Sequence, residues 1–260
     1  MRRGGRNAFV YVFWGLPIFM AACNTDAKEE NLTREEAIIA KTIEQAESVE
    51  SYTIEGGILD DIVWEDKRTE YTHSLFAGTK TFKPQRAYSQ LEEKYGSGET
   101  EDTTFTAEIY ENGNDIYVNL DNGGWQKPDG YEYDETDYEA AIRVLDGIEN
   151  LEEMIIEETE DAYEIRYSEA DEVLYDVYKP ISSATARGIT FVETGSPEVF
   201  LVIDKADYTV REFTMKFFYE DEAGSKAESV LTVEYRFDNI NEVENIEIPA
   251  EVIKEAEQNE

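Results

Sequence analysis

Few residues in this chain are suited to catalysis. The sequence contains one histidine, His73, and one cysteine, Cys23, which excludes most zinc sites and any Cys–His pair within the mature fold. It contains no GxSxG, HExxH or phosphate-binding glycine motif. A lone histidine in a strand-like stretch is more often structural than catalytic. We therefore predict a protein that is not an enzyme and that has no cofactor.

Carboxylates are the most abundant charged groups. Asp and Glu number 60 against 23 Lys and Arg, which gives a formal net charge of −37. This charge repels nucleic acid and anionic lipid headgroups, so no nucleic-acid partner is expected. Calcium prefers oxygen ligands, but no acidic group has EF-hand spacing. The candidates are Asp60-Asp61, Glu65-Asp66 and the run from Asp129 to Glu139. We interpret them as solvated surface and predict no metal site.

The first residues have the pattern of an export signal. Arg2, Arg3 and Arg6 precede an apolar run from Ala8 to Met20 that is too short to span a membrane comfortably. The run ends in Met20-Ala21-Ala22-Cys23, which is typical of a bacterial lipobox, where the cysteine sulfur receives a diacylglycerol. We predict a signal peptide over 1–22, and a lipidated Cys23 with a polar tether over 23–32.

Hydrophobic spacing divides the rest of the chain, 33–260, into helices and strands of one domain. A capping box at Thr33 and Glu36 predicts a helix to about Val49. Helical spacing returns near 135–149, after Ser168 and after Pro249. Alternating apolar residues predict strands elsewhere. Their ranges are 51–64, 68–83, 86–95, about 105–109, 116–120, 155–156, 163–167, 198–204, 207–220 and 226–238. This order predicts an α+β domain built on one large antiparallel sheet.

Several short patterns, in this order behind the lipobox, resemble the LolA/LppX-like group of exported proteins and lipoproteins. The first is a Lys-Pro corner in 78–88, and the second is Asn112-Gly113 followed by Trp125. The third is Asp204-Lys205 followed by 208–211, and the last is Asn239 followed by 246–252. The resemblance covers about 33–256. It implies a curved half-barrel of antiparallel strands with helices on the concave face, and a lipid held between sheet and helices.

Aromatic and aliphatic side chains would then line the space between sheet and helices. Ordinary core packing explains any one of them, but a half-barrel cannot fully fill its own concavity, so an apolar pocket remains an alternative. The predicted lining comprises Val173, Leu174, Val177, Phe213, Met215, Phe217, Tyr219, Leu231, Val233, Tyr235 and Phe237.

These features predict a lipoprotein on the extracytoplasmic face of the cell membrane, anchored through the lipid on Cys23. Its expected ligand is a lipid or another hydrophobic molecule. The alternative is a non-catalytic surface module that contacts another envelope protein. An enzyme of unfamiliar type is a third hypothesis, but no motif supports it.

Overall fold

The computed structural model describes residues 32–97, 100–128, 137–169, 174, 191–194, 196–221 and 227–259. The predicted signal peptide, Cys23, Val173 and Val177 lie outside these residues, as does nearly all of the helix predicted after Ser168. Residues Thr33–Glu260 form one compact unit. None of the helices in the described part of the chain combines the length and hydrophobicity needed to cross a membrane.

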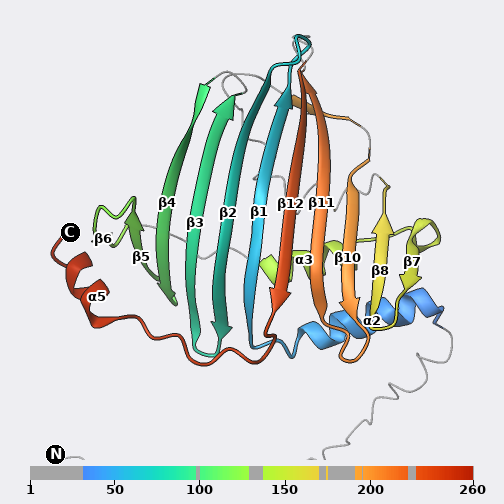
Figure 1. The fold of residues 1–260 in the computed structure, drawn as a ribbon. Helices are drawn as coiled ribbons and strands as arrows, with labels where there is room; N and C mark the ends of the chain where they lie inside the picture. The colour runs from blue at the N-terminus through green and yellow to red at the C-terminus, as the bar shows by residue number, and fades with distance from the viewer. Residues whose placement is uncertain are drawn as a thin grey trace, which may run out of the picture. The chain divides into compact units, whose positions relative to one another are not determined.

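One antiparallel sheet dominates the domain, and the described residues contribute twelve strands to it (Figure 1). The order across the sheet is β6-β5-β4-β3-β2-β1-β12-β11-β10-β8-β7, with β9 paired to β11. Strands β1 to β6 therefore form a meander, and β1 then pairs with β12 near the end of the chain, with Thr53 opposite Asp238. The strands are β1 (Ser51–Val63), β2 (Thr69–Phe82), β3 (Gln85–Ser97), β4 (Thr100–Asn112), β5 (Asp115–Leu120), β6 (Trp125–Gln126), β7 (Ile155–Glu158), β8 (Ala162–Tyr167), β9 (Phe191–Glu193), β10 (Glu198–Asp204), β11 (Val210–Asp221) and β12 (Glu228–Asp238).

The turns between strands use the residues that the sequence indicated. Gly113 has φ +59° at the hairpin between β4 and β5, where Asn112-Gly113 predicted a turn. Asn122 and Gly124 also have positive φ, at +57° and +101°, in the turn before β6. Glycine and asparagine tolerate these angles better than other residues, so they fix the register of the flanking strands.

Two helices pack on one face of the sheet, which we call the inner face. They are α2 (Arg34–Ala46) and α3 (Asp137–Asp146). The capping box of α2 is confirmed, because the Thr33 hydroxyl accepts from the Glu36 amide at 3.2 Å and Glu36 accepts from the Thr33 amide at 2.7 Å. Both helices bury one side, as their spacing predicted, including Ile38 and Ile39 of α2 and Val144 and Leu145 of α3. A short 3-10 helix (Leu151–Glu153) follows α3.

The last helix, α5 (Ala250–Ala256), packs on the opposite, outer face. Its buried residues Val252 and Ala256 contact Tyr117 of β5, with Tyr110 and Trp125 beside them. The rings of Tyr110 and Trp125 lie 5.4 Å apart. Most of the helical packing is therefore on the inner face, but the β5–β6 end of the sheet is completed from the other side.

The strand register aligns apolar inner-face residues into one row across the sheet, which we call the cross-sheet row. Each member is the Cα partner of the next on the neighbouring strand. The row runs Ile156, Ile165, Leu201, Phe213, Tyr235, Gly56, Phe76, Leu91, Ala107, Leu120. At its centre Gly56 has no side chain, so the rings of Phe76 and Tyr235 meet over β1 with centroids 5.8 Å apart. A Cβ at Gly56 would lie only 2.8 Å from the Tyr235 ring.

Candidate functional site

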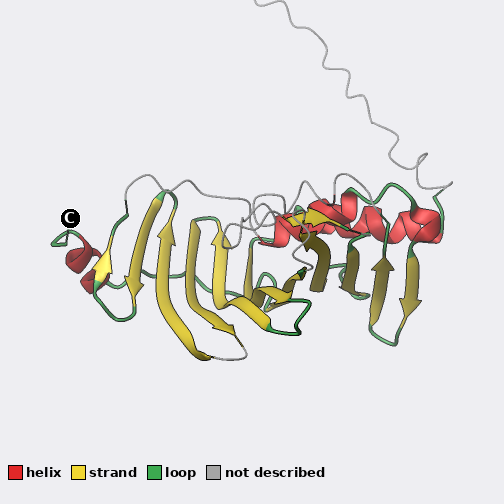
Figure 2. Cartoon of the chain, turned by 90° about the horizontal axis from the view of Figure 1, so that it is seen from above, coloured by secondary structure: helices red, strands yellow, loops and turns green. Residues whose placement is uncertain are grey.

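The cross-sheet row lies in two different environments. Figure 2 shows α2 and α3 over the end of the curved sheet that contains β7 to β12, whereas β2 to β5 extend away from them. We call the strands β7, β8, β10, β11, β12 and β1 the covered half, and β2 to β5 the open half. This division decides which inner-face side chains are available to a ligand.

The predicted pocket lining lies in the covered half and is buried there. Phe213, Met215 and Phe217 of β11 and Val233 and Phe237 of β12 have at most 1% of their surface exposed. The other described members are also buried, and all belong to the main hydrophobic core: Leu174, Tyr219, Leu231 and Tyr235. Their burial accounts for them as core packing, so a ligand-lining role for these residues remains a prediction.

Aromatic rings occupy the space between α3 and the sheet. Tyr138 of α3 lies with its ring 4.9 Å from that of Phe237 and 5.7 Å from that of Tyr52. The ring of Phe237 meets that of Tyr52 edge-on at 5.4 Å. Such offset and edge-to-face pairs stabilise a core beyond the area they bury.

The hydroxyl of Tyr138 ties α3 to the start of β11. It accepts a hydrogen bond from the Val210 amide at 3.1 Å. Burial raises the pKa of Tyr138 to about 12, so the phenol stays neutral at physiological pH. The polar end of this buried ring is therefore satisfied.

In the open half the same row emerges from the core. The core cluster reaches Phe76, which is partly buried against it. Beyond Phe76, Leu91 is partly buried and the small Ala107 is 6% exposed, whereas Leu120 at the end of the row is 59% exposed. Phe105, which lies two positions before Ala107 on the same face of β4, is 47% exposed. Ile109 and Val118 are Cα partners on the same face and are partly buried. This half therefore presents an apolar surface that the described helices do not fill.

At one end of this apolar surface lies an ion pair between Lys80 of β2 and the start of α3. Lys80 of β2 forms an ion pair of 2.7 Å with Asp137, the first residue of α3. Burial disfavours the charge on Lys80, but Asp137, together with Tyr52 and Glu111, outweighs this effect and raises the pKa of the amine. Glu111 of β4 lies in the same inner-face row, separated from Lys80 by the small side chain of Ala87. Burial raises the pKa of Glu111, and Lys80 offsets part of this effect.

The other end of the apolar surface also carries a carboxylate. Glu93 of β3 is the Cα partner of Phe105, and it accepts a hydrogen bond from the Tyr95 hydroxyl. Glu111 lies six positions after Phe105 in β4. At about 3.3 Å per residue, the apolar surface between the two ends is about 20 Å long.

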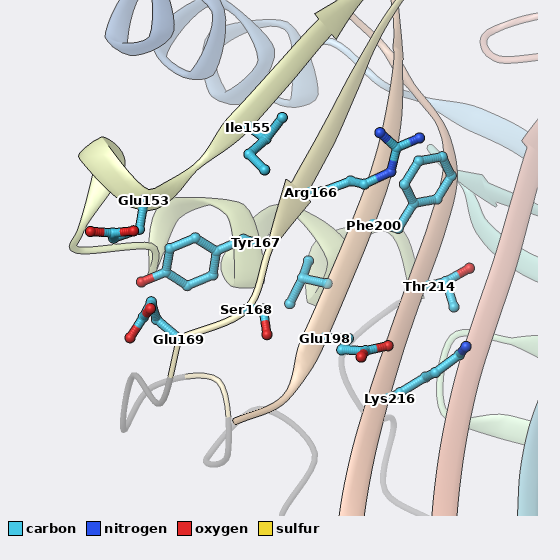
Figure 3. Close-up of a pocket in the computed structure, with 11 residues that line it drawn as sticks. Glu153, Ile155, Arg166, Tyr167, Ser168, Glu169, Glu198, Phe200, Thr214 and Lys216 are labelled. Atoms are coloured by element: carbon cyan, nitrogen blue, oxygen red, sulfur yellow. The ribbon is translucent and has the colours of Figure 1, made fainter. Parts of the chain in front are cut away.

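Three hollows among the described residues lie on the outer face. One has a volume of about 580 Å³ and is lined by side chains of β7, β8, β10 and β11 (Figure 3). Ile155 and Phe200 form its apolar part. The Arg166 guanidinium lies 5.5 Å from the Phe200 ring centroid, and it also pairs with Glu157 at 2.8 Å. Two smaller hollows of about 480 and 340 Å³ share Glu55 on the same face. All three mix charged with apolar groups.

His73 and the acidic groups show no catalytic or metal-binding arrangement within the described residues. The His73 ring is on the outer face, 3.0 Å from Asp61 and 4.7 Å from the Tyr71 ring. No serine joins this pair in the contacts found, and no group of three or more metal-ligating side chains is present in that part of the chain. Residues 129–136 of the third candidate acidic run lie outside the described structure.

The sequence predicted the strands of the open half, but it did not predict that their inner face is more exposed than that of β11 and β12. The alternation of Phe105, Ala107 and Ile109, and of Ile116, Val118 and Leu120, predicted two strands with an apolar face. Nothing local indicates that this face is more exposed than the face of β11 and β12. The Lys80–Asp137 pair was also missed, because its partners are 57 residues apart and the chain is rich in carboxylates.

The architecture defines the class of protein. A single open, curved antiparallel sheet with helices on its inner face is an α+β half-barrel, which confirms the predicted fold class and is the architecture that the LolA/LppX-like resemblance implied. A family model described as "Family of unknown function (DUF6612)" matches residues 34–257, and the chain belongs to this family. No curated protein matches.

Two solved structures are similar to this chain at low sequence identity. One is a LolA superfamily protein from Nitrosomonas europaea, 9% identical, covering 83% of this chain and 96% of that one, with a TM-score of 0.21. The other is a DUF1329 family protein from Desulfovibrio piger, 10% identical, covering 80% and 94%, with a TM-score of 0.20.

Proposed function

We propose that this protein is a lipid-anchored lipoprotein of the extracytoplasmic face of the cell membrane, and that it binds a lipid or another hydrophobic ligand without catalysis. The anchor would be the diacylglycerol on Cys23, which the lipobox pattern supports. The ligand would lie on the inner face of the open half.

The single observation that carries the ligand proposal is the cross-sheet row. Its members are apolar on both halves, yet Leu201 is fully buried while Leu120 is 59% exposed. Covering apolar surface contributes about 25 cal/mol per Å², so exposed side chains such as Phe105 and Leu120 favour association with an apolar molecule.

Charge on the open half should abolish binding. In Phe105→Glu/Leu120→Glu, two exposed apolar side chains become carboxylates, which an apolar ligand cannot accommodate without desolvating them. We expect the full chain to lose at least about tenfold in affinity for a fluorescent acyl probe with an uncharged head. Lipid that co-purifies with the unmodified protein, measured by native mass spectrometry, should also be lost.

The matched control places the same charges on the outer face of neighbouring strands. Thr104 and Gln90 are exposed residues of β4 and β3 whose register directs them to that face. Thr104→Glu/Gln90→Glu should bind the probe as the unmodified protein does. Equal loss in both variants, or no lipid and no probe binding in the unmodified protein, would refute the ligand proposal.

The anchor has its own test. Metabolic labelling with palmitate should mark the protein, and Cys23→Ser should remove the label and release the protein from the membrane fraction. Labelling that persists in Cys23→Ser would contradict the anchor proposal and would leave the ligand proposal unaffected.

A second candidate function is a surface module that contacts an envelope protein. The outer-face hollow beside Ile155 supports it, because that side chain is 57% exposed next to Phe200 and Arg166 (Figure 3). Apolar and arginine side chains together are typical of contact surfaces. Crosslinking in cells should then recover a partner that Ile155→Glu loses and Phe105→Glu retains.

A further inference from the structure

Charged groups on the inner face of β1 to β5 are almost all of one sign. By register, the described residues of this face carry four carboxylates and one amine. These are Asp60, Glu70, Glu93, Glu111 and Lys80. The amine of Lys80 is already paired with Asp137 at 2.7 Å. Among the described residues of this face, an incoming anion would therefore meet no cation that is not already paired.

The carboxylates stand where the polar end of a ligand must lie. Glu111 and Glu93 are at opposite ends of the apolar surface that contains Phe105, Leu91 and Ile109. An elongated ligand lying along β4 would reach one of them with its head in either orientation. The apolar middle fits a hydrocarbon body, and both ends fit a positive, hydrogen-bond-donating group.

Glu111 has unused capacity to accept hydrogen bonds. Its carboxylate is partly buried, and no hydrogen bond or ion pair within 4 Å is formed by it among the described residues. A partly buried carboxylate without a hydrogen-bond donor is costly, so a donor that reaches Glu111 would gain more than one that meets a solvated carboxylate. The charge of Lys80 offsets only part of the effect of burial on Glu111, because its amine forms its ion pair with Asp137.

We propose that the ligand of the open half is an amphiphile with a cationic head, such as a long-chain ammonium compound, and that Glu111 and Glu93 exclude anionic amphiphiles. This inference rests on the binding function proposed above. An anionic head at either end would face a like charge in a partly desolvated place.

The test compares three probes with one chain length and different heads: decylamine, decyl glucoside and decyl sulfate. Each is titrated below its micellar concentration into the full chain carrying Cys23→Ser, which has no acyl anchor, and binding is measured by calorimetry. We expect decylamine to bind at least about tenfold more tightly than decyl sulfate, with decyl glucoside between them.

Two double variants separate the site from the net charge of the whole protein. Glu111→Gln/Glu93→Gln removes the inner carboxylates, and Glu108→Gln/Glu92→Gln removes two outer-face carboxylates of the same strands. Both variants change the net charge equally, so long-range attraction is matched. The inner variant should reduce the preference for decylamine over decyl sulfate at least about fivefold, whereas the outer variant should retain it.

The outcomes distinguish this inference from the proposed function. If all three probes bind with similar affinity, or if the outer variant loses the preference as the inner one does, head-group selection is refuted and hydrophobic binding stands. If decyl sulfate binds most tightly, selection is also refuted. If no probe binds, the proposed function fails, and this inference fails with it.

Discussion

The two halves of the sheet present the same apolar row to different surroundings. In the covered half, Leu201 and Phe213 are sealed by helices α2 and α3 and by the rings around Tyr138. In the open half, Leu120 keeps 59% of its surface exposed. The difference shows that alternating apolar residues predict which face of a sheet is apolar, but not whether that face is buried in the core or exposed. Packing makes the row a core in the covered half, whereas the described helices leave Phe105 and Leu120 of the open half exposed.

The largest expected effect comes from truncating one leucine of the row in each half of the sheet. Leu201→Ala should lower the free energy of unfolding by about 2 to 5 kcal/mol, because it opens a cavity in a packed core. Leu120→Ala should cost less than about 1 kcal/mol, because little packing is lost. Urea unfolding followed by circular dichroism measures both. Similar losses in the two variants would show that the halves do not differ as described.

A smaller effect is expected at the boundary between the halves. Asp137→Asn leaves the amine of Lys80 charged and partly buried without its carboxylate partner. We expect a loss of about 2 to 3 kcal/mol in unfolding free energy, or a melting temperature lower by roughly 5 to 10 °C for a domain of this size. Asp115→Asn, which removes the more exposed pair with Lys127, should change stability by less than about 1 kcal/mol. If Asp137→Asn left the unfolding free energy unchanged, this pair would not hold α3 to the sheet.

The smallest effect concerns Glu111 and depends on pH. Its pKa is raised in the folded state, so folding favours the protonated form, and stability declines as pH rises from the unfolded pKa through the folded one. Glu111→Gln should therefore raise the melting temperature slightly at pH 7. The gain should vanish below about pH 4, where the carboxyl is protonated in both states. Calorimetry across this range measures it, and a gain that grows toward acid pH would contradict the burial of Glu111.

The sequence predicted the strands of both halves, because alternation such as Phe213-Met215-Phe217 or Ile116-Val118-Leu120 depends only on the geometry of a strand. It predicted α2 from the capping box at Thr33 for the same local reason. It did not predict which half the helices cover, because that depends on contacts such as those of Tyr138 with Phe237 and Val210. The outer-face position of α5 was equally hidden, since Tyr117 lies on the face opposite its apolar neighbours Ile116 and Val118.

The pairing of β1 with β12 sets the order in which the molecule can fold. Thr53 must find Asp238, 185 residues further along the chain. Until β12 is available, β1 can pair only with β2. The cross-sheet row then ends at Gly56 of β1. High contact order of this kind slows folding. A chain that appears N-terminus first, as in synthesis, would therefore complete the cross-sheet row only once β12 had appeared.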